Sequence, residues 1–134
     1  NKMDDIIIGN SGVKNKPYIV LKGGWVDLPN GDRMYIYTGY TFDNGSIPKV
    51  LKWLYDTFKW EFLNYLQKAF LVHDYLYNYR GYHTGPHLEL RPITRALADD
   101  FMAYFMKKNG NSDTKIKVFY MAVRICGWPH FGKM

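Results

Sequence analysis

Residues 61–79 read EFLNYLQKAFLVHDYLYNY, and this stretch decides how the chain folds. Apolar side chains recur in it every three or four residues, which is typical of a helix with one buried face. The face is made by six side chains: Phe62, Leu66, Ala69, Phe70, His73 and Tyr77. A histidine therefore lies at the centre of the predicted buried stripe and should point away from water.

The first 47 residues favour strands. A short apolar run over residues 6–8 is closed by a predicted turn at residues 9–12, and a second run over 18–21 stops at Gly23 and Gly24. The strongest hairpin signal is Asn30-Gly31, which predicts paired strands over residues 24–38. Residues 40–42 extend or follow that hairpin.

Helical patterns follow from Ser46, which can cap a short helix up to Phe58. Beyond the long helix, residues 80–90 are rich in Gly, Pro and His and predict a loop. A third helix is expected over 92–108, stopped by Asn109-Gly110, and a fourth from residue 112 or 113 to about 127. We therefore expect one α+β domain over residues 1–134. Antiparallel β-hairpins (1–47) precede about four helices (48–134), two of which form an antiparallel pair.

Composition narrows the class of protein. The chain has 134 residues, enough for one domain with a core, and no apolar run long enough to span a membrane. The first residues contain no apolar region of signal-peptide length, so secretion by a signal peptide is not expected. A single cysteine, Cys126, excludes an internal disulfide and favours a reducing compartment or a virion.

The net charge of +6 is spread over both halves of the chain, which argues against nucleic acid as a partner. Lipid headgroups or an acidic protein remain as anionic partners. Aromatic residues make up 18 %, and many tyrosines lie in or near the 61–79 helix. We expect part of them to form a hydrogen-bonding scaffold around His73 and Asp99.

His73 and its neighbours form the first candidate site. A buried imidazole needs partners for its nitrogens, and Tyr77 lies one helical turn away on the same face. Asp74 is rotated by about 100° from His73, so the two side chains should reach different partners. The simpler interpretation is a core histidine bonded to a carbonyl or a tyrosine.

Asp99 and Asp100 lie in the middle of the apolar third helix and form the second candidate site. A helical wheel places Asp100 within the main apolar stripe and Asp99 on the opposite side. An inward-facing acid needs a donor such as His73, Tyr77 or Arg95, because an unpaired buried carboxylate is costly. The alternatives are a solvated acid and, for Asp99, an ion pair with Arg95 at i+4.

Residues 42–48 are a third candidate site. Asp43, Asn44 and free carbonyls beside Gly45 could bind a hard cation, although a turn followed by a helix cap explains the same residues. The histidines have no zinc-site spacing, and neither a P-loop nor a GxSxG motif is present.

Four motifs occur in order along the chain: TFDNGSIP at 41–48, HDYLY at 73–77, AD at 98–99 and YMAVRICGW at 120–128. This pattern resembles the phage and prophage family catalogued as domain of unknown function 1353. Asn44-Gly45 stands where that family usually has Gly-Ala. The resemblance covers about residues 24–130 and implies a phage source, but no activity.

The HDxxY and AD helices are also similar, more weakly, to those of phospholipases A2. That similarity implies His73 as the base that activates water, Asp99 as the acid that orients it, and Tyr77 as the partner of Asp99. It implies Asp74 as a calcium ligand, with residues 42–48 as the calcium loop. On this basis we take Asp99 rather than Asp100 as the orienting acid.

Two functions follow as hypotheses. The first is a phage-encoded, metal-assisted hydrolase that acts on lipid or cell-envelope esters, with calcium as its cofactor. The second is a phage accessory protein without catalysis, either a virion component or an anti-defence factor that binds a host protein. Nucleic-acid binding ranks third. Each hypothesis places the protein in the host bacterial cytoplasm or in the virion.

Overall fold

The computed structural model describes residues 5–13, 16–42 and 67–126. Within these ranges the chain is a mixed α+β structure, as predicted. The strands are β1 (Ile7–Val13), β2 (Lys16–Lys22), β3 (Gly24–Asp27), β4 (Arg33–Ile36), β5 (Thr41–Phe42), β6 (Gly81–Thr84) and β7 (Glu89–Pro92). The helices are α2 (Gln67–Tyr79), α3 (Arg95–Lys108) and α4 (Asp113–Cys126).

The first sheet has the order β1-β2-β5 and is antiparallel. The predicted turn at residues 9–12 is wrong, because β1 continues through them with a register shift between Asn10 and Val13. An irregularity of this kind lets a strand absorb glycines and still pair with its neighbour. The prediction that the next strand stops before Gly23 and Gly24 is confirmed.

The second sheet has the order β3-β4-β6-β7. The predicted hairpin around Asn30-Gly31 is confirmed, with Trp25 paired to Tyr35 and Val26 to Met34. Residues 40–42 do not extend this hairpin. Instead, Thr41 and Phe42 pair with β2, so the chain crosses from one sheet to the other.

Gly23 lies at the other passage between the sheets, where β2 leads into β3. A Cβ atom there would lie 2.1 Å from the carbonyl oxygen of Ile36, so only glycine fits. The amide of Gly23 donates to the hydroxyl of Thr38 at 2.9 Å. The two sheets are thus joined by two chain segments that touch.

The predicted loop over residues 80–90 is wrong. These residues begin a hairpin, β6–β7, which pairs with β4 through Tyr35 and His83. Strands therefore do not all precede the helices. The sequence pattern of this hairpin is weak, because each strand has only four residues and the turn between them contains Gly85 and Pro86. Short strands of this kind are stabilised by their neighbours rather than by their own pattern.

Three of the four predicted helices lie in the described residues. α2 confirms residues 67–79 of the helix expected over 61–79. Residues 61–66 lie outside the described residues, as does the short helix expected up to Phe58. α3 begins three residues later than expected, because Pro92 belongs to β7 and Thr94 caps the helix by accepting from the amide of Leu97. α4 matches its prediction, with the Ser112 hydroxyl accepting from the amide of Lys115.

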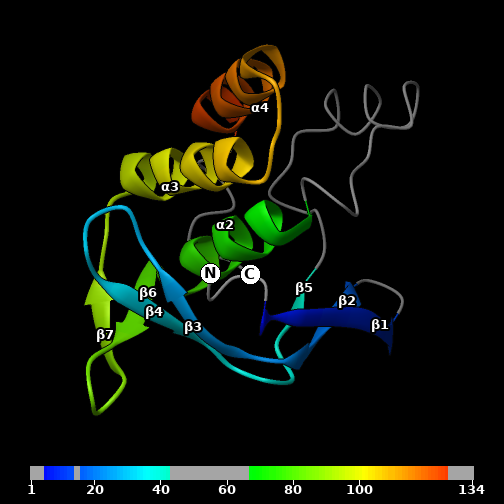
Figure 1. The fold of residues 1–134 in the computed structure, drawn as a ribbon, viewed down its shortest axis with the longest axis vertical. Coiled ribbons are helices and arrows are strands. Elements are labelled where there is room, and N and C mark those ends of the chain that lie inside the picture. The colour runs from blue at the N-terminus through cyan, green and yellow to red at the C-terminus, as the bar shows by residue number, and fades with distance from the viewer. Residues whose placement is uncertain (1–4, 14–15, 43–66, 127–134) are drawn as a thin grey trace.

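α2 is the centre of the molecule. Figure 1 shows it between the strands on one side and α3 and α4 on the other. All its side chains from Ala69 to Tyr77 are buried. A helix that is covered on all sides can place polar side chains only where other elements supply partners. Across the described ranges, no helix has the length and apolar character needed to cross a membrane.

Candidate functional site

His73 of α2 and Asp99 of α3 form the polar pair at the interface of these two helices. The Nε2 atom of His73 lies 2.7 Å from Oδ1 of Asp99. His73 is 1 % exposed and Asp99 is 0 % exposed, so water competes little for this bond. The sequence predicted such a donor for an inward-facing acid, and His73 is one of the donors that it named.

Four side chains converge on the Asp99 carboxylate. The Tyr77 hydroxyl donates to Oδ1 at 2.6 Å, alongside His73. Arg124 of α4 donates to Oδ2 at 3.0 Å, and Arg95 lies 3.6 Å from the same oxygen. Tyr77 and Arg95 were among the donors predicted from the sequence, whereas Arg124 was not predicted. The signal that could have found it is that Arg124 is the only charged residue within residues 118–126 of α4.

Arg95 links α3 to the end of α4. Its guanidinium donates to the carbonyl oxygens of Val123 at 2.8 Å and Arg124 at 3.0 Å. These carbonyls belong to the last turn of α4, which has no later amides of its own to pair with them. Arg95 therefore holds the backbone that carries Arg124, and both arginines are fixed against Asp99.

The protonation states of the pair follow from its surroundings. Burial lowers the pKa of His73, and the bond to Asp99 offsets this only in part, so the imidazole is neutral near pH 7. Burial alone would raise the pKa of Asp99, but the hydrogen bonds from His73 and Tyr77 outweigh it and lower that pKa. An ionised Asp99 can only accept, so Nε2 of His73 carries the hydrogen and Nδ1 carries the lone pair.

The helical wheel for the third helix was wrong. Asp99 is buried, whereas Asp100 is exposed and accepts a hydrogen bond from the Tyr120 hydroxyl at 2.7 Å. The buried positions of α3 are Ala98, Asp99, Phe101, Met102, Phe105 and Met106. The helical-wheel prediction was wrong because α3 is apolar on several sides. The apolar stripe that contains Asp100 is not the side of α3 that is buried.

Asp74 points to a different partner from His73, as the rotation along the helix predicted. Its Oδ2 atom accepts from the Tyr40 hydroxyl at 2.7 Å, and the residue is fully buried. The bond and the desolvation of Tyr40 raise the pKa of that hydroxyl, with desolvation the larger cause. Tyr40 lies three residues before Asp43, which with Asn44 is outside the described residues.

The described residues do not provide a complete set of calcium ligands. Calcium takes six to eight oxygen ligands. In residues 5–13, 16–42 and 67–126, no three His, Cys, Asp or Glu side chains come together as a metal site needs, and Asp74 already accepts from Tyr40.

The tyrosines of α2 face two different sides of the helix. Tyr77 belongs to the histidine site, and its ring centroid lies 4.1 Å from that of His73. Tyr75 and Tyr79 instead pack with Tyr40 and His83 on the side of α2 that faces the strands. Of the described tyrosines predicted to form a scaffold around His73 and Asp99, Tyr77 bonds to Asp99, whereas Tyr75 and Tyr79 pack towards the strands and Tyr120 bonds to Asp100.

Chemically, the site is a neutral histidine held in one tautomer and one orientation by an ionised acid. Such a pair can accept a proton at Nδ1 and stabilise the resulting imidazolium. It can equally serve as a buried polar network that fixes how α2, α3 and α4 pack.

Neither the curated proteins nor the solved structures contain a match to this chain. A family model described as "Protein of unknown function (DUF1353)" matches residues 20–123. The matched range includes β3 to β7, all three described helices up to Val123, and the His73, Tyr77, Arg95 and Asp99 cluster. The chain therefore belongs to the DUF1353 family.

Proposed function

We propose that this protein is a phage-encoded hydrolase in which His73 is the general base for attack of water on an ester of a lipid or of the cell envelope. The observation that supports the proposal is the bond between neutral His73 and ionised Asp99 at 2.7 Å. A general base must be unprotonated at working pH and held in one orientation, and the bond to Asp99 together with the lowered pKa of His73 supports both requirements.

In the proposed step, Nδ1 of His73 takes a proton from water while the water oxygen adds to the ester carbonyl. The proton then passes from Nδ1 to the departing alkoxide, so a carboxylic acid and an alcohol are formed. Asp99 stays ionised and stabilises the imidazolium. In this step Tyr77, Arg95 and Arg124 are positioning residues, since each of them contacts the Asp99 carboxylate.

Calcium is the proposed cofactor, and the assay is therefore run both with and without it. Asp74, Asp43 and Asn44 are the residues that would hold it, and calcium would stabilise negative charge on the reacting carbonyl oxygen. The proposed place of action is the host bacterial cytoplasm or the virion.

The test is release of fatty acid from phosphatidylglycerol and phosphatidylethanolamine vesicles by the purified protein, with calcium or with a chelator. We expect the wild type to be active and His73→Gln to lose at least about a hundredfold, which is the lower end for general-base catalysis. Asp99→Asn should also be impaired, whereas Asp100→Asn should keep full activity because Asp100 is exposed and outside the pair. Unfolding curves of each variant separate loss of catalysis from loss of fold.

Inactivity of the wild type towards both lipids and towards short-chain nitrophenyl esters, with and without calcium, would overturn the hydrolase. So would equal rates for the wild type and a folded His73→Gln variant.

The second candidate is a phage accessory protein without catalysis, either a virion component or a factor that binds a host protein. Its support is the complete burial of the His73 and Asp99 pair, together with the four partners that fill the Asp99 carboxylate. A buried network of this kind specifies packing. Mass spectrometry of purified virions tests the virion role, and absence from the particle would exclude it.

A further inference from the structure

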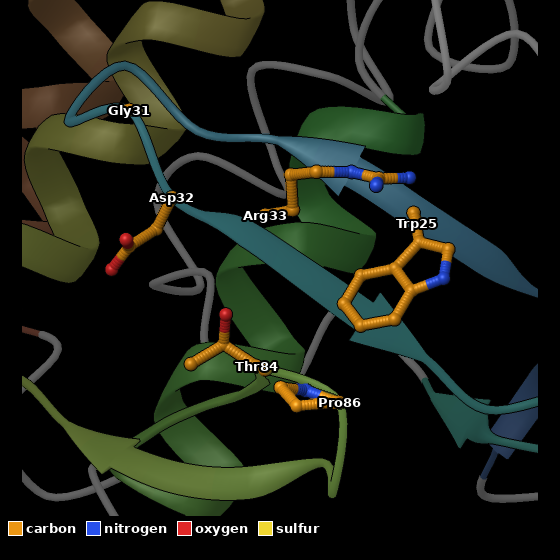
Figure 2. A pocket seen from close by; sticks show the side chains of 7 residues that line it. Trp25, Gly31, Asp32, Arg33, Thr84 and Pro86 are labelled. Atoms are coloured by element: carbon orange, nitrogen blue, oxygen red, sulfur yellow. The ribbon is translucent and has the colours of Figure 1, made fainter.

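A hollow of about 420 Å³ lies between the turn that joins β3 to β4 and the tip of the β6–β7 hairpin. It is lined by residues 31–33, by residues 84–86 and by Trp25 (Figure 2). None of these residues takes part in the His73 and Asp99 cluster. Its volume falls within the range of small-molecule sites, roughly 300–1,000 Å³.

The two walls of the hollow are tied together. The Asp32 carboxylate, from the first wall, accepts from the Tyr82 hydroxyl and from Arg91 through its Oδ2 atom. Tyr82 and Arg91 come from β6 and β7, and Asn30 also donates to the Tyr82 hydroxyl at 3.2 Å. The hollow is therefore formed before any ligand arrives, which lowers the entropic cost of binding.

Polar groups with unused bonding capacity line this hollow. The Thr84 hydroxyl and the Oδ1 atom of Asp32 have no hydrogen-bond partner among the described residues. Arg33 uses only Nε, in an exposed ion pair with Asp27 at 3.6 Å, so its terminal nitrogens are also available there. The lining thus offers a hydroxyl, an acceptor and several donors together.

Trp25 supplies the apolar part of the lining. Its ring is held by an edge contact with Tyr35 at 5.2 Å between centroids and by the Arg33 guanidinium at 4.9 Å. Figure 2 shows the indole on one side and Asp32 on the other, with the Thr84 hydroxyl between them. A ligand in the hollow would meet an aromatic surface and polar groups at the same time.

We propose that this hollow binds a neutral saccharide ring. Sugar hydroxyls both donate and accept, so they can donate to Asp32 and accept from Arg33 and Thr84. The C–H face of a sugar suits the electron-rich face of an indole. Asp32 is paired with Arg91 and Arg33 with Asp27, so the charges around the hollow balance and favour a neutral ligand over an ionic one. The proposal is independent of the proposed hydrolase.

The test is a titration of the ¹⁵N-labelled full chain with three neutral probes: maltotriose, cellotriose and N,N′-diacetylchitobiose. We expect at least one probe to cause saturable shifts in the amide signals of residues 25, 31–33, 84 and 85, since Pro86 has no amide hydrogen. The first two probes report a glucan and the third an N-acetylated envelope glycan, so the source of the ligand follows from which probe binds.

Two variants test the assigned residues. Trp25→Ala should weaken binding at least about tenfold, since a buried aromatic contact dominates small interfaces. Thr84→Val keeps the shape and should weaken it by about three- to tenfold, as expected for one hydrogen bond. Tyr104→Ala, at an exposed tyrosine on α3, is the matched control and should bind as the wild type does.

Three results would overturn the proposal. They are the absence of saturable shifts with all three probes, unchanged affinity in both Trp25→Ala and Thr84→Val, and saturable shifts of the same residues with sulfate but with none of the sugars. The spectrum of each variant also reports whether it is folded.

Discussion

Replacing Asp99 with Asn should destabilise the protein far more than the same change at its neighbour Asp100. The substitution keeps the shape of the side chain and removes the charge that four partners share. Breaking a buried ion pair at one partner costs about 3–5 kcal/mol. Arg95 and Arg124 are 20 % and 34 % exposed, so water can solvate them in part, and we expect a value near 3 kcal/mol.

The measurement is the free energy of unfolding in urea, followed by circular dichroism for the wild type, Asp99→Asn and Asp100→Asn. For a chain of this size, a loss of about 3 kcal/mol corresponds to a melting temperature lower by roughly 10 °C. Asp100 is exposed and makes one bond, to Tyr120, so its variant should lose at most about 1 kcal/mol. Equal losses in the two variants would refute the idea that Asp99 is the electrostatic centre of the helical layer.

Further predictions concern pH, a glycine and the second carboxylate. The folded state lowers the pKa of His73, so the unfolded chain binds more protons, and stability should fall as pH drops below the unfolded value of about 6.5. Urea titrations at several pH values should show a shallower fall in His73→Gln, and an unchanged slope would contradict the burial argument. Gly81→Ala should cost about 2 kcal/mol or more, because the new Cβ would lie 2.2 Å from the Arg91 carbonyl oxygen. A melting temperature equal to that of the wild type would exclude that clash. Tyr40→Phe should lose about 1–3 kcal/mol, since it removes the hydroxyl that donates to buried Asp74, while Tyr104→Phe, the exposed control, should lose nothing measurable. Thermal unfolding distinguishes the two, and matched curves would show that the bond to Asp74 contributes nothing.

The three described helices and the β3–β4 hairpin were predictable because their signals are local. Asn30-Gly31 marks a tight turn, and Asn109-Gly110 marks a helix end, wherever the rest of the chain lies. The β6–β7 hairpin was not predictable from its own residues. Its strands are held by β4 and by the contacts of Tyr82 with Asp32, which is fifty positions away in the chain.

The candidate site was predictable in part for the same reason. The divergence of His73 and Asp74 follows from helix geometry alone. Which of two adjacent acids faces inward depends on how α3 is turned against α2, and no local pattern encodes that rotation when several faces are apolar. Arg124 was missed because its partner, Asp99, lies on another helix.

The arrangement of Arg95 and Arg124 around one carboxylate has a consequence for the inheritance of these positions. A relative that lost the acid at position 99 would keep two cationic side chains beside an uncharged, covered surface. Evolution should therefore change positions 95, 99 and 124 together, and a family member with an apolar residue at 99 should carry uncharged residues at the other two. Such coordinated replacement would mark this trio as a single inherited unit spanning two helices.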